Sequence, residues 1–193
     1  MIEYIKGKIT ALTPTYVIIE TGGLGYFVNI SLSSYSRLDS MPECSLLIHE
    51  VIREDTHLLF GFSSEAERNI FRLLISVSGV GANTARMMLS SVEAVGIETA
   101  IMKSDVNMLK GIKGIGAKTA QRIIVDLKDK VGKSAEAGEI FDQEGNTIRE
   151  EAFTALVMLG FPKSSVNKTI DKLMREERNL TVEQLIKKAL KIL

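Results

Sequence analysis

Two stretches of this sequence repeat each other, Gly79-Val80-Gly81-Ala82-Asn83-Thr84-Ala85 and Gly114-Ile115-Gly116-Ala117-Lys118-Thr119-Ala120. They start 35 residues apart, and the match continues upstream, where Val77 corresponds to Ile112. Self-similarity of this kind indicates that one small structural unit occurs twice. The repeat therefore predicts two copies of a helix, a glycine-containing turn and a second helix in the central part of the chain.

The glycine turns predict a phosphate-binding site. Backbone N–H groups at the start of a helix have no acceptor within the helix, and with the helix dipole they attract an anion. Glycine lets an oxygen atom approach closely and lets the chain adopt a positive φ. On one helical face, Lys118 and Arg122 add positive charge. The residues predicted to contact DNA are Gly79, Gly81, Asn83, Thr84, Gly114, Gly116, Lys118, Thr119 and Arg122.

Phosphate contacts carry no base information, so we expect binding that ignores sequence and weakens strongly with salt. Because the two turns are held at a fixed separation, the repeat further suggests that they hold two phosphates on opposite sides of a minor groove. Other interpretations exist. A lone Gly-x-Gly is commonly only a tight turn between helices, and the duplication is what favours a ligand. Neither copy has the third glycine of a dinucleotide-binding motif or follows a strand. Gly132-Lys133-Ser134 resembles the end of a P-loop, but Leu127 stands where that motif requires glycine.

The N-terminal segment, residues 1–63, is rich in short runs of β-branched and aromatic residues. About five such runs predict a small barrel or sandwich. The predicted strands are Ile2 to Ile9, Tyr16 to Glu20, Tyr26 to Ile30, Leu46 to Arg53 and His57 to Phe62. The pattern changes at Ser64, the expected N-cap of a helix, with Glu67 closing a capping box.

Three further segments follow the barrel. Residues 64–133 show helical spacing interrupted by glycines, and residues 134–148 have the composition of a flexible acidic linker. Residues 149–193 predict a module of three short amphipathic helices, with Thr181 and Gln184 capping the last. We therefore expect an α+β, multidomain protein.

Composition restricts the possible functions. The chain has 24 Lys+Arg and 24 Asp+Glu, so a chain-wide basic coat for nucleic acid is excluded. Divided by segment, the net charges are −3, +4, −4 and +3, an acidic barrel followed by a basic helical segment. Cys44 with only His49 and His57 beside it cannot form a disulfide framework or a Cys/His zinc site. Because a signal peptide and a membrane span are also not expected, the sequence predicts a cytoplasmic protein without metal or cofactor.

At this point the residues resemble a known family. The run Val51-Ile52-Arg53-Glu54-Asp55-Thr56-His57-Leu58-Leu59-Phe60-Gly61-Phe62, the two glycine turns and the run Gln121-Arg122-Ile123-Ile124-Val125-Asp126-Leu127-Lys128-Asp129 closely resemble the bacterial RuvA family of Holliday junction-binding subunits. The resemblance covers the whole chain. It implies an oligonucleotide-binding (OB) fold barrel, tandem helix-hairpin-helix motifs that grip the arms of a four-way junction, and a three-helix, UBA-like C-terminal domain.

The resemblance also implies roles for particular residues and partners. Glu54 and Asp55 correspond to an acidic pin at the junction centre, whereas without the resemblance two carboxylates at an exposed turn are merely solvated. The family forms a homotetramer, and whether one or two tetramers enclose the junction stays open. Leu156, Leu159 and Leu190 match positions used toward the ATP-driven motor RuvB, although such residues are ordinarily core. The resolvase RuvC is a further implied partner.

Three functions remain to be weighed. The first is a non-catalytic scaffold that holds the junction open during branch migration in recombination and repair, and it implies the SOS response as its setting. The second is a helix-hairpin-helix DNA-repair nuclease or glycosylase, which needs catalytic groups that the sequence does not supply, because adjacent Glu54 and Asp55 point in different directions. The third is an adaptor that binds protein without nucleic acid, whose binding would ignore the glycine turns.

Overall fold

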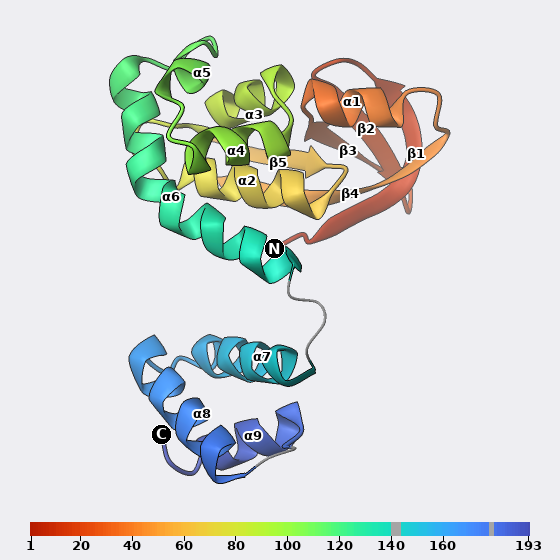
Figure 1. Ribbon diagram of the computed structural model, residues 1–193. Helices are drawn as coiled ribbons and strands as arrows, with labels where there is room; N and C mark the ends of the chain where they lie inside the picture. Colours follow the sequence, from red (N-terminus) through yellow and green to blue (C-terminus); the bar gives the residue numbers. More distant parts are fainter. Residues whose placement is uncertain (140–143, 178–179) are drawn as a thin grey trace. The chain divides into compact units, whose positions relative to one another are not determined.

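The computed structural model describes residues 1–139, 144–177 and 180–193, and their side chains outside residues 132–147. The chain divides into two compact units, Met1–Gly132 and Lys133–Leu193 (Figure 1). The first unit contains a β-barrel and a group of helices, and the second contains helices. The expected α+β, multidomain fold is confirmed.

In the described part of the chain, five strands close into a barrel with the order β1-β2-β3-β5-β4. All neighbouring pairs are antiparallel except β3 and β5, which are parallel. Apolar side chains on the inner face, including Val17, Ile19 and Val28, are buried completely. The strands are β1 (Tyr4–Leu12), β2 (Tyr16–Thr21), β3 (Leu24–Asn29), β4 (Glu43–Ile52) and β5 (His57–Phe62).

A short helix that the sequence did not predict, α1 (Leu32–Leu38), follows β3. Ser31 caps its N-terminus by accepting a hydrogen bond from the Ser34 backbone N–H at 3.0 Å. Both hydroxyls also donate to the buried Glu67 carboxylate, Ser34 at 2.8 Å. Because a buried carboxylate must be hydrogen-bonded, Glu67 fixes α1 of the barrel to the helix that carries it.

Helices occupy the rest of the first unit, as predicted. They are α2 (Glu65–Ile75), α3 (Ala82–Ser91), α4 (Ala94–Met102), α5 (Val106–Lys110) and the start of α6 (Ala117–Glu139). Their core includes two side chains of the barrel, because Phe60 and Phe62 of β5 lie against Phe71 of α2, with ring centroids 5.2 and 4.8 Å apart. The barrel also has a hydrophobic cluster of its own, which includes Val17, Ile19 and Ile48, so the predicted boundary at residues 63 and 64 lies close to the division between two clusters, with Phe60 and Phe62 belonging to the helical one.

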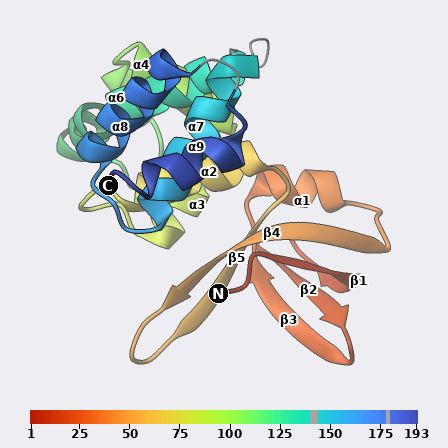
Figure 2. The same cartoon turned by 90° about the horizontal axis from the view of Figure 1, so that it is seen from below.

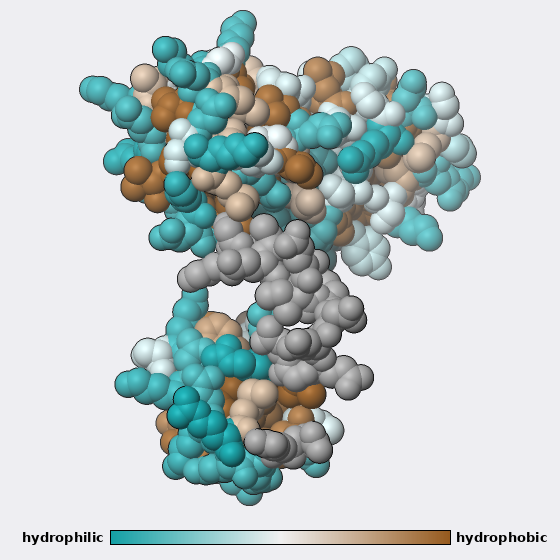
Figure 3. All heavy atoms as spheres, in the orientation of Figure 1, coloured by the Kyte–Doolittle hydropathy of each residue, from teal (hydrophilic) through white to brown (hydrophobic). Residues whose placement is uncertain are grey.

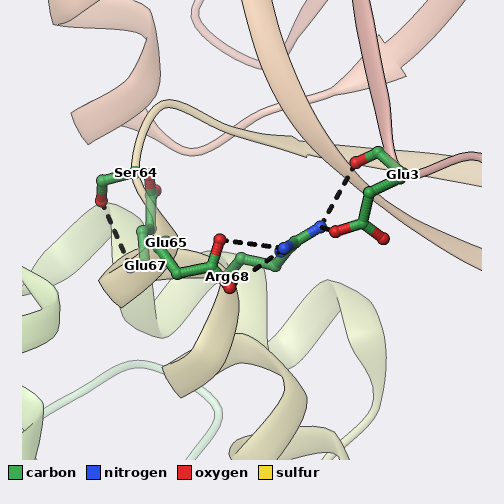
Figure 4. A network of polar contacts seen from close by, with 5 residues as sticks. All are labelled: Glu3, Ser64, Glu65, Glu67 and Arg68. Atoms are coloured by element: carbon green, nitrogen blue, oxygen red, sulfur yellow. Dashed lines mark hydrogen bonds and ion pairs between the residues drawn. The ribbon is translucent and has the colours of Figure 1, made fainter. Parts of the chain in front are cut away.

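A second polar tie joins the barrel to α2 (Figure 4). The buried Arg68 guanidinium contacts the Glu65 carboxylate at 2.9 Å and the Glu3 carboxylate at 2.5 Å, and it also donates to the Glu3 backbone carbonyl. Ser64 caps α2 as expected. The predicted capping box is wrong in its second half, because the Glu67 side chain accepts from Ser31 and Ser34 rather than returning to the N-cap.

Helix α6 is longer than the sequence indicated. It continues to Glu139, so residues 134–139 of the predicted linker are helical, which is compatible with their content of good helix formers, and residues 144–148 of that linker form the start of the next helix. Residues 140–143 of that linker lie outside the described residues. Within the described ranges, no helix combines the length and apolar character that a membrane crossing requires.

In its described residues the second unit contains α7 (Glu144–Met158), α8 (Lys163–Glu176) and α9 (Val182–Ala189). Gly160, at φ +98°, separates the first two helices. The expected capping box is present, because Thr181 accepts from the Gln184 N–H and Gln184 accepts from the Thr181 N–H. The three-helix module is therefore confirmed, with a small core that includes Leu156 and Ile170.

Candidate nucleic-acid interface

The two glycine turns have the same local structure. We call them the first corner, Gly79–Gly81 between α2 and α3, and the second corner, Gly114–Gly116 between α5 and α6. Gly79 has φ +94° and Gly114 has φ +90°. Positive φ values of this size are adopted mainly by glycine.

The hydrogen bonds that close the two corners also correspond. In the first corner the Val80 N–H donates to the Val77 carbonyl at 3.0 Å, and in the second the Ile115 N–H donates to the Ile112 carbonyl at 3.1 Å. The sequence repeat is thus a structural repeat.

Both corners are open to solvent. All four corner glycines are exposed, and a Cβ atom built on Gly79, Gly81 or Gly116 would meet no described atom within 4 Å. No side chain of the described residues caps α3 at Gly81, so the first N–H groups of that helix point outward without an acceptor. Two helix N-termini preceded by bare backbone therefore offer donors to an anion.

The predicted side chains lie around these corners. Asn83, Lys118 and Arg122 are exposed, while Thr84 and Thr119 are half-buried. Lys118 and Arg122 lie on the first turns of α6, four residues apart. The geometry therefore brings all nine predicted DNA-contacting residues to the two corners and the helix starts that follow them, although their contact with DNA stays a prediction.

Sequence reasoning did not assign a role to Arg86, which fixes α3 to the barrel. Its Nη1 donates to the Thr15 carbonyl at 2.9 Å and to the Asn29 side-chain oxygen at 3.1 Å. Burial lowers the pKa of Arg86, but a guanidinium remains a cation in a protein. Because its Nη1 is held by these two acceptors, Arg86 orients the first corner relative to the barrel.

The acidic pair lies at the tip of the β4–β5 hairpin, which projects from the barrel (Figure 2). The Arg53 N–H donates to the Thr56 carbonyl at 2.8 Å, so Glu54 and Asp55 occupy the two central positions of a tight turn, and both are exposed. The pair is thus presented to solvent at the end of a two-stranded arm, where a carboxylate repels any phosphate that comes near.

The three leucines predicted to face a partner do not lie together on the surface of the second unit. Leu156 is 0% exposed in the three-helix core, so it stabilises the module and does not contact a partner in this fold. Leu159 and Leu190 are 61% and 44% exposed. Hydrophobic residues do reach the visible surface of this unit (Figure 3). Because Leu156 is buried, the predicted partner surface is reduced to Leu159 and Leu190.

Cys44 and His49 are residues of the barrel with possible nucleophilic or acid–base chemistry. Burial raises the pKa of the Cys44 thiol, which keeps the thiol protonated and poorly nucleophilic. Burial lowers the pKa of His49, with the positive charges of Arg72 and Arg68 acting in the same direction. Among the described residues, no group of three or more His, Cys, Asp or Glu side chains could hold a metal ion.

Comparison with known proteins matches three segments of the chain to family models. Residues 1–61 match the RuvA N terminal domain, residues 71–129 the SAM-like Helix-hairpin-helix tandem, and residues 147–193 the RuvA C-terminal domain.

Similar proteins match over almost their whole length. A protein of Parabacteroides distasonis is 50% identical over 196 residues, covering 100% of both chains, and one of Christiangramia forsetii is 48% identical over 191 residues, covering 99% of both. Both are named Holliday junction branch migration complex subunit RuvA. On this similarity, and with the barrel and the paired corners in place, the chain belongs to the RuvA family.

Proposed function

We propose that this chain is a non-catalytic subunit that binds four-way DNA junctions by structure rather than sequence and holds them open for branch migration. The observation that carries the proposal is the pair of exposed, equivalent corners in one compact unit with an exposed acidic hairpin tip. The relatives named as Holliday junction branch migration complex subunits support it.

Two opposite electrostatic effects explain how such a unit selects a junction. The corners donate backbone hydrogen bonds to phosphates, which attract any DNA backbone regardless of base sequence. Glu54 and Asp55 repel phosphates, which disfavours an uninterrupted duplex at the position of the hairpin tip. A junction whose strands separate around the tip satisfies both effects.

The proposed assembly is a homotetramer, in which four subunits hold the four arms of the junction and bring eight pin carboxylates to its centre. An ATP-driven motor, RuvB, supplies the movement, and the exposed Leu159 and Leu190 contribute to its docking surface. RuvC is proposed as a further partner on the same junction, and the cytoplasm as the compartment.

A gel-shift titration tests the proposal. The full chain is titrated against a synthetic four-way junction and against a linear duplex of equal length, with Mg²⁺ present, and the strands are afterwards separated under denaturing conditions. We expect preferential junction binding and intact strands, and a separate ATPase assay should detect no ATP hydrolysis. Equal affinity for duplex and junction contradicts structure selectivity, and cleaved strands or released bases favour a nuclease or glycosylase.

A further inference from the structure

The two corners differ in charge at three equivalent positions. A shift of 35 residues superposes the copies, and at each of these positions the first copy has a neutral residue and the second a cation. The six side chains are exposed. The pairs are Ser78 and Lys113, Asn83 and Lys118, and Met87 and Arg122.

The cation within α3 does not compensate for this difference. Arg86 corresponds to the exposed Gln121 of α6, and its guanidinium is bound to Thr15 and Asn29 of the barrel. Within the described residues the one cation on α3 is therefore Arg86, whose Nη1 is held by the barrel, and the exposed positions of the first corner offer backbone N–H groups without a side-chain cation. The second corner offers N–H groups together with three cations.

Met87 makes the two copies asymmetric in packing as well. It lies one turn after Asn83 on α3 and is 37% exposed. Its Cε atom is 3.5 Å from the position that a Cβ atom on Gly114 would take. At the equivalent place in the first corner, Gly79, no described atom lies within 4 Å of such a Cβ. The thioether thus covers part of the second corner and remains partly open to solvent.

We propose that the two corners hold DNA by different means. The second corner binds one strand through its backbone amides and through Lys113, Lys118 and Arg122. The first corner binds through its amides alone, and Met87, which lies between the two corners, makes an apolar contact with the sugar surface. This inference rests on the proposed function, because it concerns how the same site holds DNA. It assigns Lys113 and Met87 to the DNA interface, and it places the contacts between side-chain cations and phosphates at the second corner.

The salt dependence of binding measures this difference. Each phosphate that a cation neutralises contributes about 0.9 to the slope of log affinity against log salt, whereas an apolar contact contributes nothing to it. Loss of the three cations should therefore lower the slope by about 2.7 for each bound subunit. Loss of the Met87 side chain should lower affinity by about fivefold without changing the slope.

The experiment compares full-length variants on a four-way junction at several salt concentrations. The first variant carries Lys113→Gln, Lys118→Gln and Arg122→Gln. The second carries the reciprocal changes Ser78→Lys, Asn83→Lys and Met87→Arg. Met87→Ala is measured alone. The matched control, Lys163→Gln with Lys168→Gln and Lys172→Gln, removes the same charge from α8 of the second unit.

We expect a lower slope for the first variant, a higher slope and tighter binding for the second, and the slope of the unmodified chain for the control and for Met87→Ala. The inference is overturned if the first variant and the control shift the slope equally, if the reciprocal variant gains nothing, or if Met87→Ala leaves affinity unchanged. Failure of the unmodified chain to bind the junction would instead contradict the proposed function.

Discussion

The glycine corners and the tip of the β4–β5 hairpin are both exposed turns, yet they present opposite charges to DNA. The corners expose backbone N–H groups at the starts of α3 and α6. The tip exposes two carboxylates at the end of an arm of the barrel. Attraction to phosphate cannot by itself distinguish a junction from a duplex, and repulsion alone cannot bind either. Affinity and selectivity are therefore assigned to different turns, and they should be separable by mutation.

The largest effect is expected from filling the corners. Gly81→Leu with Gly116→Leu should weaken binding to junction and duplex alike by at least about 100-fold, because a side chain there blocks the approach of a phosphate to the amides. Both positions are open and neither has a positive φ, so the fold should be retained. Gel-shift titration measures the binding, and urea unfolding verifies the fold.

Gly23→Leu is the control for those corner variants. Gly23 lies in the β2–β3 turn at φ +80° with open space around it, so the substitution is more strained than either corner change. It should lower stability yet leave DNA binding intact. If the corner variants bind junctions as tightly as the unmodified chain, the corners are not the site of the grip.

A smaller effect is expected from neutralising the acidic tip. Glu54→Gln with Asp55→Asn should retain junction binding but lower the preference for junction over duplex by about tenfold, or about 1.4 kcal/mol, because duplex is no longer repelled. Competition between labelled junction and unlabelled duplex measures that ratio. Glu20→Gln with Glu43→Gln removes the same charge from other exposed positions of the barrel and should leave the ratio unchanged. An unchanged ratio in the tip variant would show that Glu54 and Asp55 do not select junction over duplex.

The smallest effect is expected where the corners and the barrel are joined. Arg86→Leu removes two hydrogen bonds between α3 and the barrel, which should lower the free energy of unfolding by about 1 to 3 kcal/mol and weaken junction binding only a few-fold. Urea unfolding with parallel gel shifts checks this. Gln121→Leu, at the exposed equivalent position of α6, should affect neither quantity. If Arg86→Leu lowers the slope of log affinity against log salt while the free energy of unfolding stays unchanged, Arg86 contacts phosphate instead.

Most of the fold could be predicted from local pattern. Alternating runs gave the strands, and the repeat placed both corners on exposed turns at helix starts. Helix α1 was missed because its serine-rich sequence has little helical propensity and is stabilised by tertiary hydrogen bonds to Glu67. The same tertiary contact made the capping-box prediction wrong, since a local rule cannot foresee a more distant partner.

The side chains of the site were harder to predict than its backbone. The leucines at positions 156 and 159 share a helical pattern, but only the structure separates the buried Leu156 from the exposed Leu159. The contact between Met87 and the second corner depends on packing between segments 27 residues apart, which periodicity does not report. Composition likewise indicated a basic helical segment but not that Arg86 is used by the barrel.

The central claim is that backbone amides at the two corners hold DNA phosphates. The most direct measurement replaces single phosphates along the junction arms by uncharged methylphosphonates and, in a parallel series, permutes the base pairs of the same arms. We predict that affinity falls when any of a few spaced phosphates in each arm is replaced, and that no base permutation changes it. Affinity that follows the base sequence and ignores the neutral linkages would contradict it.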